Sequence, residues 1–216
     1  DTRGMKVFPT FRHALGFTLI ADEFQNVRKF GAEEQTETEV FEEVLLEKLD
    51  DQQWKHRQTH EYLRWGALRG IVYDADGVTP LYNVYDEMGE TQKIVEWDLL
   101  NDNAVDPIQD GTDETLDHME LNANGEPVSG VAMLCSPGYH SALMKNKAFR
   151  EAYKYFEGQP NPHRDNLRRG FHHKGITYYR HLGSATFLAP DGTKLAHKFI
   201  PDNEAIGVPL GTRQVF

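Results

Sequence analysis

The longest uninterrupted helical pattern in the sequence runs from Glu37 to Arg69, and it constrains the fold more than any other feature. No proline occurs between Pro9 and Pro80, so nothing in the sequence forces this helix to break. A helix of this length forms a rod that contacts different neighbours along its length. Such a rod suits an extended, shell-forming protein better than a compact enzyme.

Residues at spacings of three and four form one stripe along this helix. The stripe consists of Phe41, Leu45, Leu49, Gln52, His56, Thr59, Leu63, Gly66 and Gly70. Its ends are apolar but its middle carries Gln52, His56 and Thr59, so we do not expect burial along its whole length. Thr36 or Thr38 is the expected N-cap, which places carboxylates near the positive end of the helix dipole.

Composition excludes several classes of protein. The 216 residues are enough for one large domain or two small ones, and no apolar run approaches the length of a membrane span. The single cysteine, Cys135, rules out an internal disulfide and indicates a reducing compartment. Because Asp1–Gly4 contains no leader and does not begin with Met, we interpret it as an interior cut of a longer chain.

Charge is unevenly distributed along the chain. The formal net charge of −11 argues against nonspecific nucleic-acid binding over the whole surface. Glu33–Asp51 is strongly acidic, Asn101–Glu126 has acids and no Lys or Arg, and Lys145–Arg180 is basic. Segments of opposite charge favour subunits that meet head to tail, although each charged segment is explained equally well as an ordinary solvent-exposed face.

The sequence predicts β structure both before and after the long helix. Val7–Phe30 reads as an extended hairpin that projects as an arm, with strands at Val7–Phe11 and Phe17–Ile20 and Gly16 near the bend. A three-stranded antiparallel meander is expected after the helix. Its strands fall in residues 70–77, which also supply a turn, in Leu81–Asp86 and in Gln92–Leu99.

A second region of mixed helix and strand follows. Its expected elements are a helix at Asp113–Leu121, a buried strand at Gly130–Cys135, a helix from about Tyr139 to Phe156, a mobile loop at Gly158–Arg169, strands at Gly175–Arg180, Ala196–Ile200 and Ala205–Leu210, and a turn at Ala189–Gly192. The residues expected on the inner side of the second helix are Leu143, Phe149, Ala152 and Phe156.

Cys135 and Ser136 form the most enzyme-like feature, because a nucleophile there would follow a buried strand and precede a helix. The G-x-S-x-G elbow of a hydrolase is absent, and Pro137 lacks the backbone N–H that would supply half of the oxyanion hole. A small α/β hydrolase that uses Ser136 or Cys135 with a histidine such as His172 therefore remains the alternative function. A helix cap and a buried small residue are the better interpretations.

Histidine pairs provide weaker candidates. His56 and His60 have a metal-binding spacing, but the H-E-x-x-H motif fails because Arg64 occupies its last position. His172 and His173 are adjacent, so on a strand they point to opposite faces; His181 lies in the same basic, aromatic stretch. No Walker loop, G-x-G-x-x-G or C-x-x-C occurs. We therefore predict no metal, no cofactor and no catalytic residue.

A basic loop could contact nucleic acid through its charge. Its residues are Arg164, Arg168, Arg169 and Lys174. A nucleic-acid-binding module is therefore a third option, but packing against acidic faces of neighbouring subunits accounts better for the same residues.

Four groups of residues, taken in order and spacing, carry a resemblance to a known family. They are Phe41–Val44 through Gly66–Gly70; Gly77 with Tyr82–Gly89; Val131–Cys135 with Ala142, Leu143 and Lys154; and Phe199–Asn203 with Gly207, Pro209, Gly211 and Thr212. They resemble the lambda-type major capsid proteins, the capsid protein E family of tailed phages, which share the Hong Kong 97 fold. The family has further segments before the arm and after Phe216, so the resemblance implies an incomplete chain.

The resemblance implies an α+β fold with a long spine helix, a peripheral antiparallel sheet, an extended β arm and an α/β axial domain. Residues 1–32 would be the arm (E-loop), residues 33–101 the spine helix and peripheral meander, and residues 102–216 a truncated axial domain. The implied function is a structural head protein that forms hexamers and pentamers of an icosahedral shell in the virion, assembled in the bacterial cytoplasm. Scaffold, portal and decoration proteins would be partners, with packaged DNA contacted only nonspecifically and no membrane involved.

Overall fold

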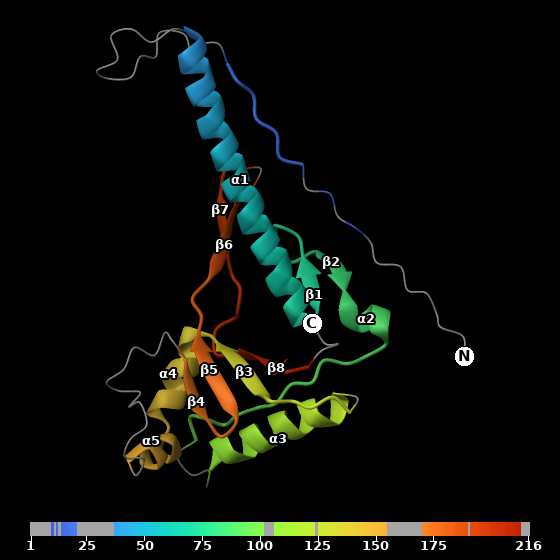
Figure 1. The fold of residues 1–216 in the computed structure, drawn as a ribbon, viewed down its shortest axis with the longest axis vertical. Coiled ribbons are helices and arrows are strands. Elements are labelled where there is room, and N and C mark those ends of the chain that lie inside the picture. The colour runs from blue at the N-terminus through green and yellow to red at the C-terminus, as the bar shows by residue number, and fades with distance from the viewer. Residues whose placement is uncertain are drawn as a thin grey trace, which may run out of the picture. The chain divides into compact units, whose positions relative to one another are not determined.

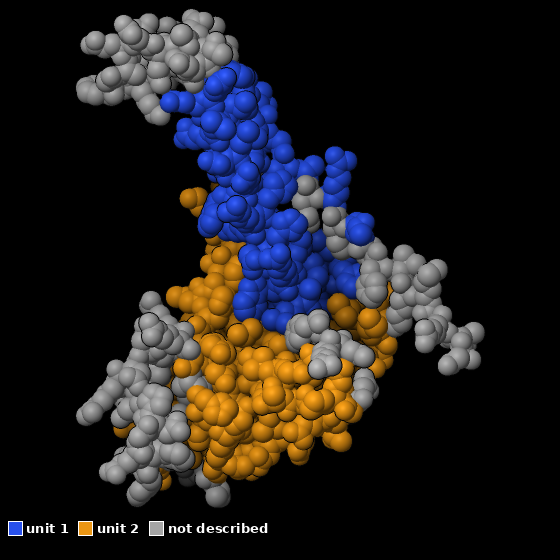
Figure 2. Space-filling view, in the orientation of Figure 1, with its two compact units in different colours: residues 1–82 blue, residues 83–216 orange. Residues whose placement is uncertain are grey.

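The computed structural model describes residues 10, 12, 14–20, 37–101, 106–123, 125–154, 170–189 and 191–212. It divides the chain into two compact units, residues 1–82 (unit 1) and residues 83–216 (unit 2), which Figure 2 colours separately. The elements in Figure 1 are α1 (Glu37–Arg69), β1 (Ile71–Tyr73), β2 (Pro80–Asn83), α2 (Val84–Met88), α3 (Pro107–Asn122), β3 (Gly130–Cys135), α4 (Pro137–Lys145), α5 (Lys147–Lys154), β4 (Phe171–His173), β5 (Ile176–Arg180), β6 (Ser184–Leu188), β7 (Lys194–Lys198) and β8 (Ala205–Leu210).

The long helix α1 confirms the sequence prediction, since its 33 residues have the expected bounds. Thr38 lies inside the helix and is not its N-cap, while Thr36 falls outside the described residues. The helix stops at Gly70, whose φ of 84° is left-handed and therefore suits glycine. Gly66 lets α1 approach β1 closely, because a Cβ there would lie 3.1 Å from the carbonyl oxygen of Ile71.

The burial of α1 varies along its length, as expected, but the most exposed part of the stripe is its apolar N-terminal end and not its polar middle, which is half-buried. In the N-terminal half, the exposed fractions are 36% for Phe41, 61% for Leu46 and 42% for Leu49. Trp54, which lies outside the predicted stripe, is 64% exposed. The described part of unit 1 therefore leaves large apolar side chains of this half in contact with solvent.

The predicted three-stranded meander is wrong. β1 and β2 form a two-stranded sheet, but the second strand ends at Asn83, whose side-chain oxygen accepts a hydrogen bond from the Tyr85 N–H (3.1 Å) and caps the short helix α2. Gln92–Leu99, the expected third strand, has no strand assignment. Its alternating pattern reflects Trp97 and Leu99 entering the core of unit 2, with Leu99 only 7% exposed.

The predicted N-terminal hairpin is only partly testable. Phe17–Ile20, expected as its second strand, has no strand assignment. Leu15, Phe17 and Ile20 are exposed. Most of Val7–Phe11, the other expected strand, lies outside the described residues.

Unit 2 is built on a four-stranded sheet with the order β4-β5-β3-β8 (Figure 1). β3 pairs in parallel with β5 and antiparallel with β8, and β4 pairs antiparallel with β5. Ser136 donates its backbone N–H to the carbonyl oxygen of Glu204 (3.0 Å). In this antiparallel register, the backbone N–H and C=O groups of even-numbered residues of β8 therefore bond to β3, and those of odd-numbered residues point away from β3. Pro209 is one of these outward residues, and its missing N–H suits an edge strand.

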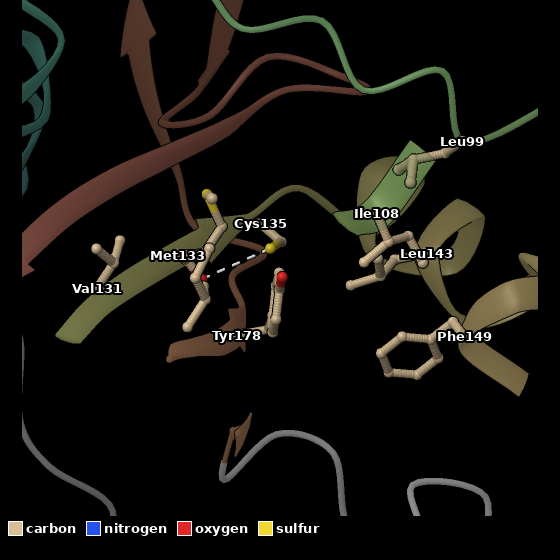
Figure 3. Close-up of a cluster of buried hydrophobic side chains, with 9 residues drawn as sticks. Leu99, Ile108, Val131, Met133, Cys135, Leu143, Phe149 and Tyr178 are labelled. Carbon is tan, nitrogen blue, oxygen red and sulfur yellow. Dashed lines mark hydrogen bonds between the residues drawn. The ribbon is translucent and has the colours of Figure 1, made fainter. Parts of the chain in front are cut away.

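One face of this sheet carries the core of unit 2. Val131, Met133 and Cys135 alternate with half-buried residues along β3, as the sequence predicted for a buried strand. Side chains from α3, α4, α5 and β5 join them, so the three helices cover the same face (Figure 3). The other members of this cluster are Leu99, Ile108, Leu143, Phe149, Ile176 and Tyr178.

Helix α3 packs on Trp97 through a glycine. A Cβ at Gly111 would lie 2.6 Å from ring atoms of Trp97, so only glycine lets the ring approach this closely. Trp97 also contacts Tyr139 and Tyr178, with ring centroids 6.0 and 6.3 Å away. Asp106 caps the helix by accepting a hydrogen bond from the Gln109 N–H at 3.0 Å. The predicted helix at Asp113–Leu121 is thus confirmed and extends further at its N-terminus.

The prediction of a single helix from about Tyr139 to Phe156 is wrong, because the helix is interrupted at Asn146 and forms two helices, α4 and α5. The buried Asn146 side-chain oxygen accepts hydrogen bonds from the N–H groups of Ala148 (3.0 Å) and Phe149 (3.4 Å). Its Nδ2 donates to the carbonyl oxygen of Leu99 (3.0 Å). One satisfied asparagine therefore starts α5 and ties the helix pair to the preceding segment.

The predicted inner residues Leu143 and Phe149 are confirmed, with exposed fractions of 0% and 1%. The side chain of Ala152, together with Phe156 and the loop Gly158–Arg169, lies outside what the structure describes.

The β-rich end of the chain agrees with the sequence in most respects. β5 and β8 occur as predicted, and Gly192 donates to the carbonyl oxygen of Ala189 (2.9 Å) in the expected turn. β7 is shifted by two residues, to Lys194–Lys198, and pairs with β6 in a separate two-stranded ribbon. Strands β4 and β6 were not predicted from the sequence.

Candidate functional site

The junction of β3 and α4 holds the two candidate nucleophiles, and both are fully buried. Cys135 and Ser136 have exposed fractions of 0%. The Ser136 hydroxyl oxygen accepts a hydrogen bond from the Tyr139 N–H (3.4 Å) and serves as the N-cap of α4. A capping serine without exposed surface offers no approach to a substrate, so the sequence-based interpretation as a helix cap is confirmed.

Cys135 is equally unsuited to nucleophilic attack. Its Sγ lies 3.5 Å from the carbonyl oxygen of Met133 (Figure 3), and burial raises the pKa of its thiol to about 12. A thiol with this pKa is protonated at neutral pH, whereas the thiolate is the reactive form.

This burial predicts slow labelling of Cys135 in the folded chain. A thiol-directed probe at neutral pH should modify Cys135 at least about 100-fold more slowly than free cysteine, because the thiolate is scarce and inaccessible. In urea the same cysteine should react at the rate of the free amino acid. Labelling under native conditions as fast as in urea would contradict the buried position.

The structure does not bring His172 to these candidates. His172 pairs with Thr177, which pairs with Ala132, three residues before Cys135. Two strand spacings and three residues place His172 roughly 14 Å from Cys135 along the sheet. Because side chains alternate, Cys135 and Ala132 also point to opposite faces. In the described structure, His172 therefore does not form the nucleophile–base pair with Cys135 that the hydrolase alternative requires.

Four other histidines lie in ring contacts. The rings of His56 and His60 stack with centroids 6.5 Å apart, His173 meets Phe149 edge-on at 5.1 Å, and His181 stacks on Phe199 at 5.9 Å. Within the described ranges, no group of three or more His, Cys, Asp or Glu side chains could hold a metal ion.

The buried His140 and the half-buried His173 are expected to make stability depend on pH. Burial, together with nearby Arg180, lowers the pKa of His140 from 6.5, and burial with Lys174 lowers that of His173. Once the pH falls below about 6.5, the pKa of these histidines in the unfolded chain, the unfolded chain binds more protons than the folded chain does. The free energy of unfolding should therefore fall as the pH falls below this value.

Urea unfolding of unit 2 at about pH 7.5 and about pH 5.5 measures this effect. His140→Gln should reduce the loss of stability on acidification, and the exposed control His118→Gln should leave it unchanged. Equal stability of the parent chain at both pH values would contradict the prediction.

The basic loop is described only at Lys174. Its ammonium group donates to the side-chain oxygen of Gln109 and lies 3.5 Å from Asp106, so it contacts the start of α3. Arg164, Arg168 and Arg169 lie outside the described residues.

Two exposed surfaces stand out among the described residues. The N-terminal half of α1 exposes large apolar side chains between acidic residues, and α3 exposes a row of carboxylates. Exposed apolar area rimmed by charge is typical of protein–protein contacts.

Comparison with known proteins shows the family to which this chain belongs. The family model of phage major capsid protein E matches residues 1–216. The chain belongs to the phage major capsid protein E family. A curated relative, the major capsid protein of Pseudomonas phage KPP10, is 28% identical over 229 aligned positions, which cover 99% of this chain and 63% of that protein.

Family membership agrees with the resemblance found in the sequence and gives no support to the hydrolase alternative. The chain spans about 63% of the length of this curated relative. Among the described helices, none is long and apolar enough to cross a membrane.

Proposed function

We propose that this chain is part of the structural major capsid protein of a tailed phage or prophage head, which forms hexamers and pentamers of an icosahedral shell around DNA. The family match over residues 1–216 carries the proposal. The long helix α1 supports it, since Phe41, Leu46 and Leu49 form exposed apolar area that contacts between copies would cover.

The proposed fold is that of Hong Kong 97. Residues 1–32 would form the extended arm (E-loop), residues 33–101 the spine helix and peripheral domain, and residues 102–216 part of the axial domain. The mixed α and β elements and the 33-residue helix α1 are compatible with this assignment.

The proposed partners follow from the same assignment. Other copies of the chain come first, and scaffold, portal and decoration proteins would act during assembly, which takes place in the bacterial cytoplasm. With a net charge of −11, the protein would contact packaged DNA only nonspecifically. We assign no catalytic residue, cofactor or metal.

Composition of purified particles tests this function. Virions purified on a density gradient from a producing host should contain this chain as their most abundant protein. Tryptic peptides covering residues 65–69 and 199–213 would report both units in one digest. Particles that contain neither peptide would contradict the proposed function.

A further inference from the structure

The exposed side of α3 is acidic from its first turn to its last. Asp110, Asp113, Asp117 and Glu120 recur at spacings of three and four, so they share one side of the helix. All four side chains are exposed, and the helix contains no lysine or arginine. Glu114 lies beside this row and forms an ion pair with Lys93 at 2.6 Å. We call the four-residue row the acidic row.

The opposite charge gathers where α4 meets α5. Lys145 ends α4, Lys147 begins α5 and Arg150 follows one turn later, and all three are exposed. The buried Asn146 between the two lysines fixes this arrangement through its three hydrogen bonds. We call Lys145, Lys147 and Arg150 the basic cluster. In the described part of one copy, no ion pair joins it to the acidic row.

Both surfaces carry charges that their own helices disfavour. Glu120 lies in the last turn of α3, where the partial charge of the helix end is negative, and that turn has no basic residue. Lys147 lies in the first turn of α5, where the partial charge is positive, and that turn has no acidic residue. Charges placed against the local helix dipole are expected where another contact compensates them.

We propose that the acidic row of one copy docks on the basic cluster of a second copy, so that neighbouring capsid subunits meet head to tail. The occupant is a second copy because the two surfaces are complementary in charge and belong to the same unit. Since each copy presents both surfaces, the contact repeats and can close a ring. Leu121, 83% exposed beside the acidic row, adds apolar area to the same contact. This inference rests on the proposed function.

Charge reversal separates assembly from folding. Asp117→Lys with Glu120→Lys reverses the end of the acidic row, and Lys147→Glu with Arg150→Glu reverses two of the three charges of the basic cluster. Glu120→Lys and Lys147→Glu place charges that the helix dipoles favour, so the melting temperature of the isolated subunit should stay equal or rise. Assembly should nevertheless need at least about tenfold more protein, because like charges now face each other between copies.

The fourfold variant that combines both reversals restores opposite charges across the contact. It should assemble within about threefold of the parent concentration, measured by light scattering and electron microscopy of the full chain. Matched controls are Glu96→Lys and Lys194→Glu, which reverse exposed charges of unit 2 outside both surfaces and should assemble like the parent.

Each outcome bears on the proposal. Loss of assembly in both reversed variants, with recovery in the fourfold variant, supports the head-to-tail contact. Unchanged assembly of the reversed variants, or no recovery in the fourfold variant, overturns it and leaves the proposed function standing. A parent chain that forms no particles overturns the proposed function and this contact with it.

Discussion

Phe149→Ala lowers the free energy of unfolding of unit 2 by about 3–5 kcal/mol. Phe149 is 1% exposed and lies in the cluster that joins the helices to the sheet (Figure 3). Removing its ring leaves a cavity next to Leu143 and takes away the edge-on contact with His173 at 5.1 Å.

Trp97 provides the measurement, because it lies in the same core while Trp54 and Trp65 belong to α1. With those two replaced by Phe, urea unfolding followed by tryptophan fluorescence reports unit 2. Leu182→Ala is the matched control, since Leu182 is 74% exposed, and it should change stability by less than about 0.5 kcal/mol. A loss below about 1 kcal/mol for Phe149→Ala would contradict the described core.

Deletion of Asp1–Phe30 spares folding but abolishes closed shells. Leu15, Phe17 and Ile20 expose 44%, 36% and 57% of their surface. None of them belongs to the core cluster of unit 2, so their removal takes little buried apolar area from the subunit. We propose that the arm lies over a neighbouring copy, so that the deletion removes a contact that only the assembled shell uses.

Circular dichroism and sedimentation of the deletion variant measure the two effects separately. The helical signal and the unfolding midpoint should match those of the parent, while particles should be absent from electron micrographs. A variant in which a Gly/Ser segment of equal length replaces the arm controls for chain length and should also fail to form shells. Normal particles from the deletion variant would refute the assigned role of the arm.

The sequence predicted those elements whose pattern and end signals are local. The bounds of α1 follow from its 33-residue periodicity and from Gly70, and those of β3 from a short apolar run that begins at Gly130 and precedes Ser136 and Pro137. In both cases the residues at the ends have a physical reason to stop the element, namely a left-handed glycine and a helix cap with proline.

Tertiary contacts explain the main errors. Gln92–Leu99 alternates like a strand, yet Trp97 enters the core by packing on Gly111 and not by pairing with another strand. Asn146 interrupts a helical pattern because its side-chain amide donates to the carbonyl oxygen of Leu99 and accepts from the N–H of Ala148. An asparagine that precedes a new helical turn is a cap signal in the sequence, but its bond to Leu99 depends on the fold.

The candidate surfaces were only partly predictable. The sequence showed the acidic and basic segments, but it could not show that a helix break at Asn146 places Lys145 at the end of one helix and Lys147 at the start of the next. Sequence also could not show that Trp54 is 64% exposed, because exposure depends on which neighbours the rest of the chain supplies. The division into residues 1–32, 33–101 and 102–216 remains a prediction, beside the observed units of residues 1–82 and 83–216.

Self-assembly is the central claim, and the size distribution of the full chain tests it most directly. The chain would be expressed alone and together with a scaffold protein, then analysed by sedimentation and negative-stain electron microscopy over a range of concentrations. We expect capsomer-sized rings or closed shells. A strictly monomeric protein at every concentration, even with the scaffold present, would contradict the capsid assignment.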